Sequence, residues 1–263
     1  MDQGWTNQIA DLVKQLSSHG IDLPSDIEPR LASYCEAMHS NSDRIGLISP
    51  NDLPHFVSKH IAASCGPLLI APPQPDEEWI DVGTGGGLPG MVLKMCRPDL
   101  KLTLIDSSHK KTNFLKDFQE DRKIQDLRIL TARVEEINRD YEKFQASAKV
   151  AAAKLAKKQG GGRRHKHYSA NRRKNERIAA PKQQTFDVVV MRAVTSLKRS
   201  LPLIESITLP GARLITFKGL GWREELADAA ENLAKFGWTH LETKQIPFAQ
   251  PKLLLLSKDA RDD

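Results

Sequence analysis

Short apolar runs alternate with amphipathic segments between residues 79 and 257, and this alternation limits the possible folds more than any other feature. The apolar runs predict strands at 79–82, 102–105, 127–130, 186–191, 212–217, 239–246 and 252–257. The segments between them predict helices that begin near Pro89 and span 109–122, 196–207 and 224–236. Such alternation is typical of an α/β fold with a doubly wound, mostly parallel sheet. The last two strands are joined by few residues, so we expect a hairpin that adds an antiparallel edge.

An all-helical portion precedes this alternation. Apolar residues recur at helical spacing over 5–18 and 26–40, and a third helix is expected over about 52–69. Three prolines at positions 72, 73 and 75 then mark a boundary. We therefore predict an N-terminal helical portion at 1–75 and a second domain at 76–258, interrupted by an insertion at 143–182.

A glycine-rich loop follows the first predicted strand and leads into a helix. Residues 81–90 read DVGTGGGLPG, and such glycines permit a tight turn and let a ligand approach the backbone. Residues 85–90 fit the dinucleotide pattern G-x-G-x-x-G, whereas 81–87 fit the acid-x-G-x-G-x-G loop of S-adenosylmethionine-dependent methyltransferases. A plain strand-to-helix turn without a ligand is the third interpretation.

Three observations favour the methyltransferase interpretation. Asp81 lies within the strand end, where a carboxylate can reach a methionine ammonium but would repel a pyrophosphate. Gly83 and Thr84 separate the strand from the dinucleotide pattern, and the terminal hairpin matches the antiparallel strand of these methyltransferases. Asp106 does not discriminate between the two cofactors: it ends the second strand, where an acid can bind the two hydroxyls of a ribose, and it also lies 21 residues beyond Gly85 as the dinucleotide pattern requires.

Basic residues are concentrated in one segment. The chain has 39 Lys and Arg against 33 Asp and Glu, a net charge of +6. Residues 143–182 hold 13 of these bases and one acid, Glu176, so the segment carries +12 and the remainder −6. We expect it to be mobile in isolation. We predict that it neutralises RNA phosphates; the alternative is a solvated insertion without a necessary role. The predicted RNA-binding residues are Arg163, Arg164, Arg172, Arg173 and Lys218, although Lys218 fits a turn position equally well.

Other features argue against several classes of protein. Cys35, Cys65 and Cys96 are odd in number and widely spaced, which disfavours a disulfide framework or a zinc site. His165 and His167 lie among arginines and make a poor metal site. No apolar run approaches the ~20 residues of a membrane helix, and no signal peptide is visible. We therefore expect a cytoplasmic protein that binds neither metal nor membrane.

Seven short motifs follow one another along the chain. They are DVGTGGGLPG at 81–90, RPDL at 97–100, LIDS at 104–107, KKTNFL at 110–115, RVEE at 133–136, MRA at 191–193 and FKG at 217–219. Together they resemble the RsmG family (also called GidB) of bacterial 16S rRNA methyltransferases, over roughly residues 30–257 without the insertion. The resemblance implies a class I S-adenosylmethionine-dependent methyltransferase with a Rossmann-like sheet. It also implies methylation of guanine N7 in the 530 loop of 16S rRNA, with the rRNA or the small ribosomal subunit as partner.

The resemblance further implies individual cofactor-binding residues. Carried over motif by motif, these are Gly83, Leu88, Val134, Glu135 and Arg192, and the ribose argument adds Asp106. Backbone groups of Val134 would read the adenine. Two plainer interpretations are a solubilising side chain for Glu135 and a surface arginine for Arg192. His60 is more often a packed helix residue than a functional one.

The chain departs from the family pattern in three places. Lys59 stands where the family usually has arginine before histidine, so bidentate binding of a phosphate or carboxylate would not be possible there. Residues 62–64 (AAS) lack the family's acid before serine, and the basic insertion is absent from the pattern. These differences concern RNA docking more than the cofactor site.

The implied reaction needs no general base. Guanine N7 bears a lone pair and no proton, so methyl transfer requires in-line alignment of the reacting atoms. We therefore assign no catalytic residue, and we expect a monomer. An NAD-binding oxidoreductase and a non-catalytic rRNA-binding assembly factor are the alternatives.

Overall fold

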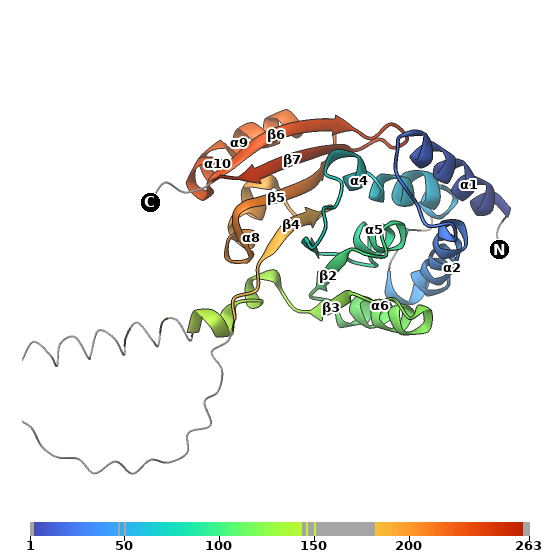
Figure 1. Ribbon diagram of the computed structural model, residues 1–263, viewed down its shortest axis with the longest axis horizontal. Helices are drawn as coiled ribbons and strands as arrows, with labels where there is room; N and C mark the ends of the chain where they lie inside the picture. The colour runs from blue at the N-terminus through green and yellow to red at the C-terminus, as the bar shows by residue number, and fades with distance from the viewer. Residues whose placement is uncertain are drawn as a thin grey trace, which may run out of the picture.

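The computed structural model describes residues 3–46, 48–49, 51–143, 146, 150 and 182–259. Within them a seven-stranded sheet has the order β3-β2-β1-β4-β5-β7-β6 (Figure 1). The strands are β1 Glu78–Val82, β2 Lys101–Asp106, β3 Leu127–Thr131, β4 Phe186–Met191, β5 Thr208–Lys218, β6 Trp238–Gln245 and β7 Lys252–Lys258. Neighbours are parallel from β3 to β5, and β7 is antiparallel to β5 and β6. The predicted doubly wound sheet with a terminal antiparallel hairpin is confirmed, and β6 is the strand at that edge.

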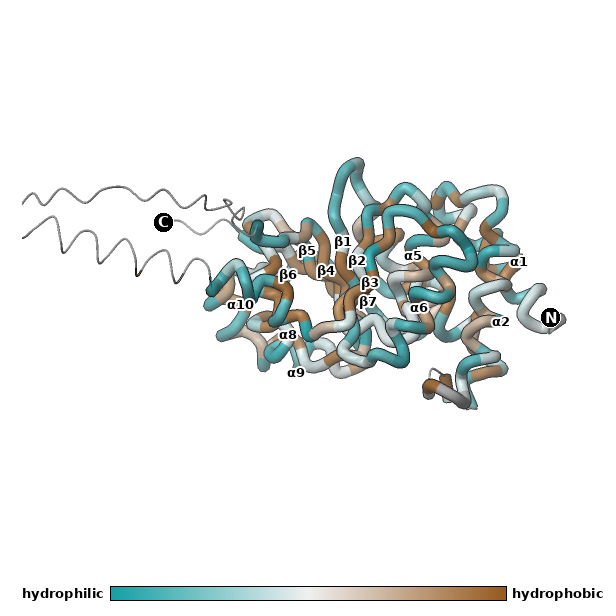
Figure 2. The backbone as a smooth tube through the Cα atoms, turned by 90° about the horizontal axis from the view of Figure 1, so that it is seen from below, coloured by the Kyte–Doolittle hydropathy of each residue, from teal (hydrophilic) through white to brown (hydrophobic). Residues whose placement is uncertain are grey.

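Apolar side chains alternate along the central strands and so serve both faces of the sheet. Trp79 and Val188 belong to one hydrophobic cluster, and their neighbours Ile80 and Val189 belong to another. The first face packs against α5 (Gly90–Cys96) and α6 (His109–Arg122). The second packs against α8 (Leu197–Ile204), α9 (Trp222–Asp228), α10 (Ala230–Phe236) and the short turns η3 (Val134–Glu136) and η4 (Glu205–Ile207). The strands consequently form an apolar layer between helices (Figure 2).

The N-terminal helices α1 (Gln3–Ser18) and α2 (Ile27–Ile45) extend the first of these clusters. Leu12 and Leu31 are buried in the same cluster as Leu104 of β2. The indole Nε1 of Trp5 donates a hydrogen bond to Leu53 O at 3.3 Å. Residues from both sides of the expected boundary at residue 75 therefore share one core.

The single helix expected over about 52–69 is wrong. The structure has four short elements there: η1 (Leu53–His55), the π-helical turn η2 (Phe56–Ile61), α3 (Ala62–Ser64) and α4 (Pro67–Ile70). Pro67 has no amide hydrogen and begins α4 instead of continuing α3. A Cβ on Gly66 would lie 2.7 Å from Ile246 and 2.8 Å from Leu253. The interruption thus allows the backbone to approach the C-terminal hairpin closely.

The helix expected at 224–236 is also divided. Helices α9 and α10 meet at Ala229, which is fully buried. Trp222 from the first half and Leu233 from the second pack against the same cluster. The interruption therefore lies where the chain is drawn tightly onto the sheet.

Candidate functional site

The ends of three parallel strands bring the predicted site residues to one edge of the sheet. Val82 of β1 pairs in register with Ile105 of β2 and with Met191 of β4. The glycine-rich loop, Asp106 and Arg192 follow these positions directly. In open α/β sheets ligands bind in the crevice outside the carboxyl ends of the strands. This edge is therefore the candidate site.

Backbone hydrogen bonds hold the glycine-rich loop in a tight turn. Gly83 N and Thr84 N both donate to Ile105 O, at 2.9 and 3.0 Å, and Gly87 N donates to Thr84 O at 2.8 Å. Gly83 has φ +73°, and a Cβ there would lie 2.7 Å from Val194. Only glycine fits this position without displacing a neighbour.

Gly85 borders open space at the centre of the loop. Its φ is +59°, and no heavy atom lies within 4 Å of the position that a Cβ would take. Its amide donates to Asp106 Oδ2 at 2.9 Å, and Asp106 Oδ1 accepts from Ser108 N at 2.8 Å. The Asp106 carboxylate is thus fixed against the loop, beside the space that Gly85 leaves open. Leu88 is half-buried and packs against the core.

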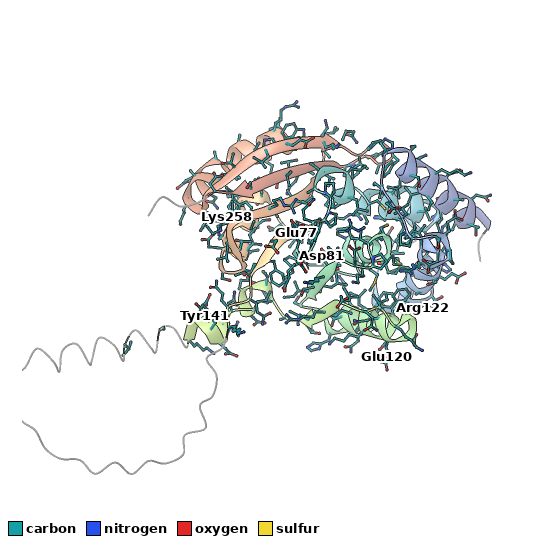
Figure 3. All side chains as sticks on the ribbon, viewed as in Figure 1. Glu77, Asp81, Glu120, Arg122, Tyr141 and Lys258 are labelled. Carbon is teal, nitrogen blue, oxygen red and sulfur yellow. The ribbon has the colours of Figure 1, made fainter. Side chains whose placement is uncertain are left out.

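Asp81 is the most deeply buried acid at this edge, in the interior of the molecule (Figure 3). Its Oδ2 accepts hydrogen bonds from Thr84 Oγ1 at 2.6 Å and from Gly90 N at 2.8 Å. Its Oδ1 is also buried and has no hydrogen-bond partner among the described residues. Burial raises the pKa of this carboxyl to about 6, against the opposing effect of the two hydrogen bonds. Oδ1 is therefore able to accept a hydrogen bond that the described residues do not supply.

The loop after β3 starts beside Asp106, because Thr131 pairs with Asp106 in register. Val134, at the start of η3, is buried and packs with the cluster on the α8 face. Glu135 is exposed. These two residues therefore follow β3, which β2 separates from β1 and its glycine-rich loop, and of the two side chains only that of Glu135 is open to solvent.

Arg192 joins the end of β4 to the π-helical turn. Its guanidinium donates to His60 O at 3.3 Å, to Ser64 Oγ at 3.1 Å and to His60 Nδ1 at 2.8 Å. It also lies 5.7 Å from the ring centre of Phe217. Arginine only donates, so His60 Nδ1 accepts and the neutral ring carries its proton on Nε2. Burial, with the Arg192 charge second, lowers the pKa of His60.

A cavity of about 830 Å³ opens beside Arg192. It lies between the π-helical turn and the loop that joins β6 to β7, and its volume is in the range of small-molecule and nucleotide sites. Its polar lining consists of His55, Ser58, Lys59, His60, Arg192, Gln245 and Gln250, without an acid among the described lining residues. The sequence analysis missed the contribution of loop 245–251, because no sequence pattern indicates that it returns to residue 60.

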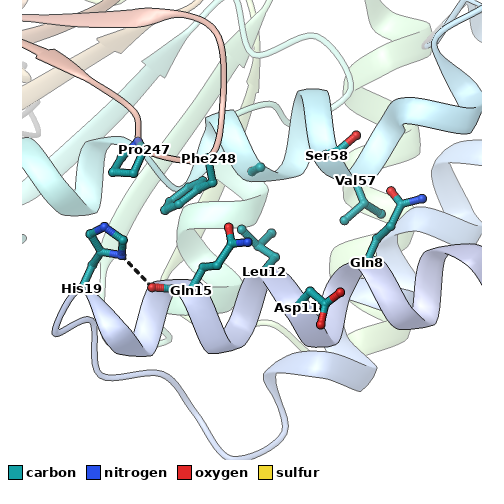
Figure 4. A pocket seen from close by; sticks show the side chains of 10 residues that line it. Gln8, Asp11, Leu12, Gln15, His19, Val57, Ser58, Pro247 and Phe248 are labelled. Carbon is teal, nitrogen blue, oxygen red and sulfur yellow. Dashed lines mark hydrogen bonds between the residues drawn. The ribbon is translucent and has the colours of Figure 1, made fainter.

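A second cavity of about 370 Å³ shares Ser58, Pro247 and Phe248 with the first (Figure 4). Phe248 forms an edge contact with the ring of His19, whose Nδ1 is 2.8 Å from Gln15 O. The hairpin loop thus lines both cavities and contacts His19, the residue that directly follows α1.

Lys218 does not join this group. It ends β5, and its Nζ donates to Glu225 Oε1 at 2.7 Å. The same carboxylate oxygen accepts from Leu197 N, at the start of α8, at 2.6 Å. Only 8% of the Lys218 side chain is exposed. The ammonium group of Lys218 is therefore paired with the Glu225 carboxylate within the protein.

The remaining predicted RNA-binding residues, Arg163, Arg164, Arg172 and Arg173, lie outside the described residues, as does most of 143–182. In the described part of the chain, no helix is long and apolar enough to cross a membrane. Nor does the described part gather three or more His, Cys, Asp or Glu side chains around a possible metal position.

Sequence comparisons connect this geometry with known proteins. A family model described as rRNA small subunit methyltransferase G (GidB) matches residues 27–157. The protein of that name from Methylobacillus flagellatus is 34% identical over 44% of this chain and 56% of its own length. The one from Enterobacter sp. (strain 638) is 25% identical over 91% of this chain and 92% of its own length. The stronger identity therefore spans only about half of the relative concerned.

A solved structure, of MtNAS in complex with MTA and tNA, matches 88% of this chain and 70% of its own. The TM-score is 0.51 at 13% identity, so the similarity concerns the fold alone. With the strand order described above, it identifies the fold as that of class I S-adenosylmethionine-dependent methyltransferases.

Proposed function

The chain belongs to the family of ribosomal RNA small subunit methyltransferase G, and we propose that it methylates guanine N7 in the 530 loop of 16S rRNA. S-adenosylmethionine would supply the methyl group from its sulfonium. The partner would be the rRNA or the small ribosomal subunit, and the enzyme would act as a monomer. Residues 1–75 would form the N-terminal helical portion and 76–258 the methyltransferase domain.

One observation carries the proposal: the buried Asp81 Oδ1 has no partner among the described residues. Open space beside Gly85 in the adjoining loop agrees with it. An ammonium group on this oxygen would satisfy the buried carboxylate and return its pKa toward the ordinary range. A pyrophosphate would instead add negative charge near the carboxylates of Asp81 and Asp106. The residues present therefore fit a cofactor that carries an ammonium group, such as S-adenosylmethionine, better than a dinucleotide.

The other predicted residues have separable tasks. The Asp106 carboxylate would hold the ribose hydroxyls, and Leu88 of the glycine-rich loop and Val134 of η3 would line the rest of the cofactor site, with backbone groups of Val134 reading the adenine. Glu135 lies at the solvent side of this region. Because guanine N7 carries no proton, these residues are needed to bind, orient and exclude water, and none is needed to remove a proton.

The cavity beside Arg192 is the proposed entry for the target base. Its polar lining includes the cations of Lys59 and Arg192 and no acid among the described lining residues, which suits a nucleotide, although Lys59 also pairs with Asp52 at 2.5 Å. The cavity reaches the end of β4 through Arg192, next to the proposed cofactor site. Arg163, Arg164, Arg172 and Arg173 would contribute phosphate contacts along the rRNA.

A pair of glycine substitutions tests the cofactor site. Gly85→Ala and Gly46→Ala both put a methyl group on a backbone with φ near +60° and with no heavy atom within 4 Å of the new Cβ. Each should lose about 1 kcal/mol of stability. Only the first fills the proposed cofactor space, so calorimetry should show S-adenosylmethionine binding at least tenfold weaker for Gly85→Ala and unchanged for Gly46→Ala.

Two further measurements separate the rival functions. NAD binding by the wild-type protein in place of S-adenosylmethionine would contradict the methyltransferase proposal and favour an oxidoreductase. Small subunits incubated with protein and S-adenosylmethionine should acquire an N7-methylguanine in the 530 loop, detected by aniline-induced strand cleavage. Binding of the subunit without any such cleavage would instead indicate a non-catalytic assembly factor.

A further inference from the structure

Tyr34 of α2 reaches out of the N-terminal helical portion into the glycine-rich loop. Its hydroxyl donates a hydrogen bond to Gly86 O at 2.7 Å, across 52 positions of sequence. The side chain is fully buried, and its ring makes an edge contact with Phe118 of α6 at 5.5 Å between ring centres. Sequence periodicity predicts Tyr34 only as an apolar position of a helix.

The hydroxyl needs this bond. A buried phenol without a partner is costly, and a phenylalanine would fill the same apolar space without that cost. Burial raises the pKa of Tyr34 well above its ordinary value, so the phenol keeps its proton and remains a donor. The contact is therefore a fixed tie between α2 and the loop.

Gly86 stands between the two glycines that shape the open space. The preceding amide, of Gly85, donates to Asp106, and the following amide, of Gly87, closes the turn on Thr84. A Cβ on Gly87 would lie 3.0 Å from the Tyr34 hydroxyl. The Gly86 carbonyl and the Gly87 amide belong to one peptide unit, so Tyr34 and Thr84 hold the two sides of that unit. The direction of this peptide, which directly follows Gly85 and Gly86, is thus set partly from outside the α/β unit.

The same N-terminal portion also contacts the opposite wall of the crevice. His60 and Ser64 hold the guanidinium of Arg192 at the end of β4. Tyr34 therefore acts on the β1 side and the π-helical turn on the β4 side.

We propose that Tyr34 is a positioning residue for the cofactor site, through which the N-terminal helices hold the glycine-rich loop in its binding geometry. The inference rests on the proposed function, because it requires S-adenosylmethionine at this loop. Loss of the hydroxyl frees the Gly86 peptide to rotate, so binding weakens although the fold is retained.

Tyr34→Phe removes one oxygen and keeps the ring. Calorimetry at 15 °C should show its Kd for S-adenosylmethionine raised about tenfold, the change expected when the loop loses one neutral hydrogen bond of about 1.4 kcal/mol. Tyr141→Phe, which removes a phenol hydroxyl elsewhere in the molecule (Figure 3), should leave the Kd unchanged.

Phe118→Leu is the matched packing control. It loosens the same contact between α2 and α6 but leaves the hydrogen bond in place, so it should lower the thermal unfolding midpoint without changing the Kd. An unchanged Kd in Tyr34→Phe overturns the inference, and so does an equal rise in Phe118→Leu. Absence of S-adenosylmethionine binding in the wild-type protein would instead overturn the proposed function itself.

Discussion

Asp81 combines complete burial with one oxygen that has no partner among the described residues. A buried carboxylate is costly unless it is fully hydrogen-bonded, and the raised pKa reflects that cost. The charged form of Asp81 is therefore destabilised by burial at the position where an ammonium group is proposed to bind. Strained or unsatisfied groups of this kind are typical of functional sites.

The stability difference between the Asp81→Asn variant and the wild-type protein should depend on pH. The folded-state pKa of about 6 exceeds the ordinary value of 3.8, so the proton adds stability that is fully present below pH 3.8 and lost as the pH rises through 6. A shift of about two pKa units corresponds to about 3 kcal/mol. Asn stays neutral, so the variant should be more stable than wild type at pH 8 by roughly this amount, and nearly equal at pH 4.

Urea unfolding at the two pH values measures both differences, and calorimetry should show that the same variant binds S-adenosylmethionine more weakly. A stability difference that does not change with pH would contradict the assignment of the raised pKa to Asp81. Stronger cofactor binding by the variant would contradict the proposed role of the carboxylate.

At the scale of elements, the end of β5 is joined to two helices through one ion pair. Glu225 of α9 accepts from Lys218 Nζ and from the first amide of α8, so a single carboxylate connects three elements. The side chains of Lys218 and Glu225 are 8% and 28% exposed. Solvent therefore screens this pair only weakly, and the loss of one partner should affect stability.

Lys218→Met should accordingly lower the free energy of unfolding by about 3 kcal/mol, the lower end of the range for breaking a buried ion pair. Adding Glu225→Gln should recover part of this loss, since the remaining side chain is then uncharged. The measurement is urea unfolding of both single variants and the double variant. If Lys218→Met instead leaves stability intact and reduces the salt slope of RNA binding by about one, Lys218 binds phosphate as the sequence suggested.

Elements with a strong local signal could be predicted from the sequence. The strand at 186–191 and the helix at 109–122 match the structure because their apolar pattern and boundaries are local. The interruption of the helix expected at 52–69 depends on remote partners: Gly66 packs on the C-terminal hairpin, and Arg192 binds the carbonyl of His60. Local propensity cannot reveal such contacts.

The same limit applies to the whole molecule. The site edge could be predicted because parallel strands end together, which brings Asp106 and Arg192 near the glycine-rich loop without further information. The cavity beside Arg192 could not, since the N-terminal portion and the hairpin loop at 245–251 build it together. Tyr34 was missed for the same reason, because a tyrosine at an apolar helix position gives no sign of its partner.

At the scale of the whole molecule, the basic charge lies in one segment, whereas the residues that join the chain across that segment lie outside it. The segment 143–182 has a formal net charge of +12, and the remainder of the chain has a formal net charge of −6. The two ends of this region are tied by Asn138, whose Nδ2 donates to Gln184 O at 2.9 Å and whose Oδ1 accepts from Gln184 N at 2.8 Å. Its Nδ2 also donates to Ser206 O at 2.6 Å. Asn138 therefore fixes the chain just before β4 enters the sheet. This contact does not depend on the length of the segment between residues 138 and 184.

Replacement of residues 145–181 by about eight Gly and Ser residues should consequently preserve the fold and the Kd for S-adenosylmethionine. RNA association should weaken, and the salt slope of log K should become shallower, by about 0.7 to 0.9 for each phosphate that the protein no longer neutralises. A full-length variant with Arg163, Arg164, Arg172 and Arg173 changed to Gln tests these four arginines in a chain of unchanged length. If both variants keep the wild-type salt slope, the segment does not bind RNA. If only the shortened chain loses affinity, other parts of the segment are responsible, and the RNA-binding assignment of these four residues fails.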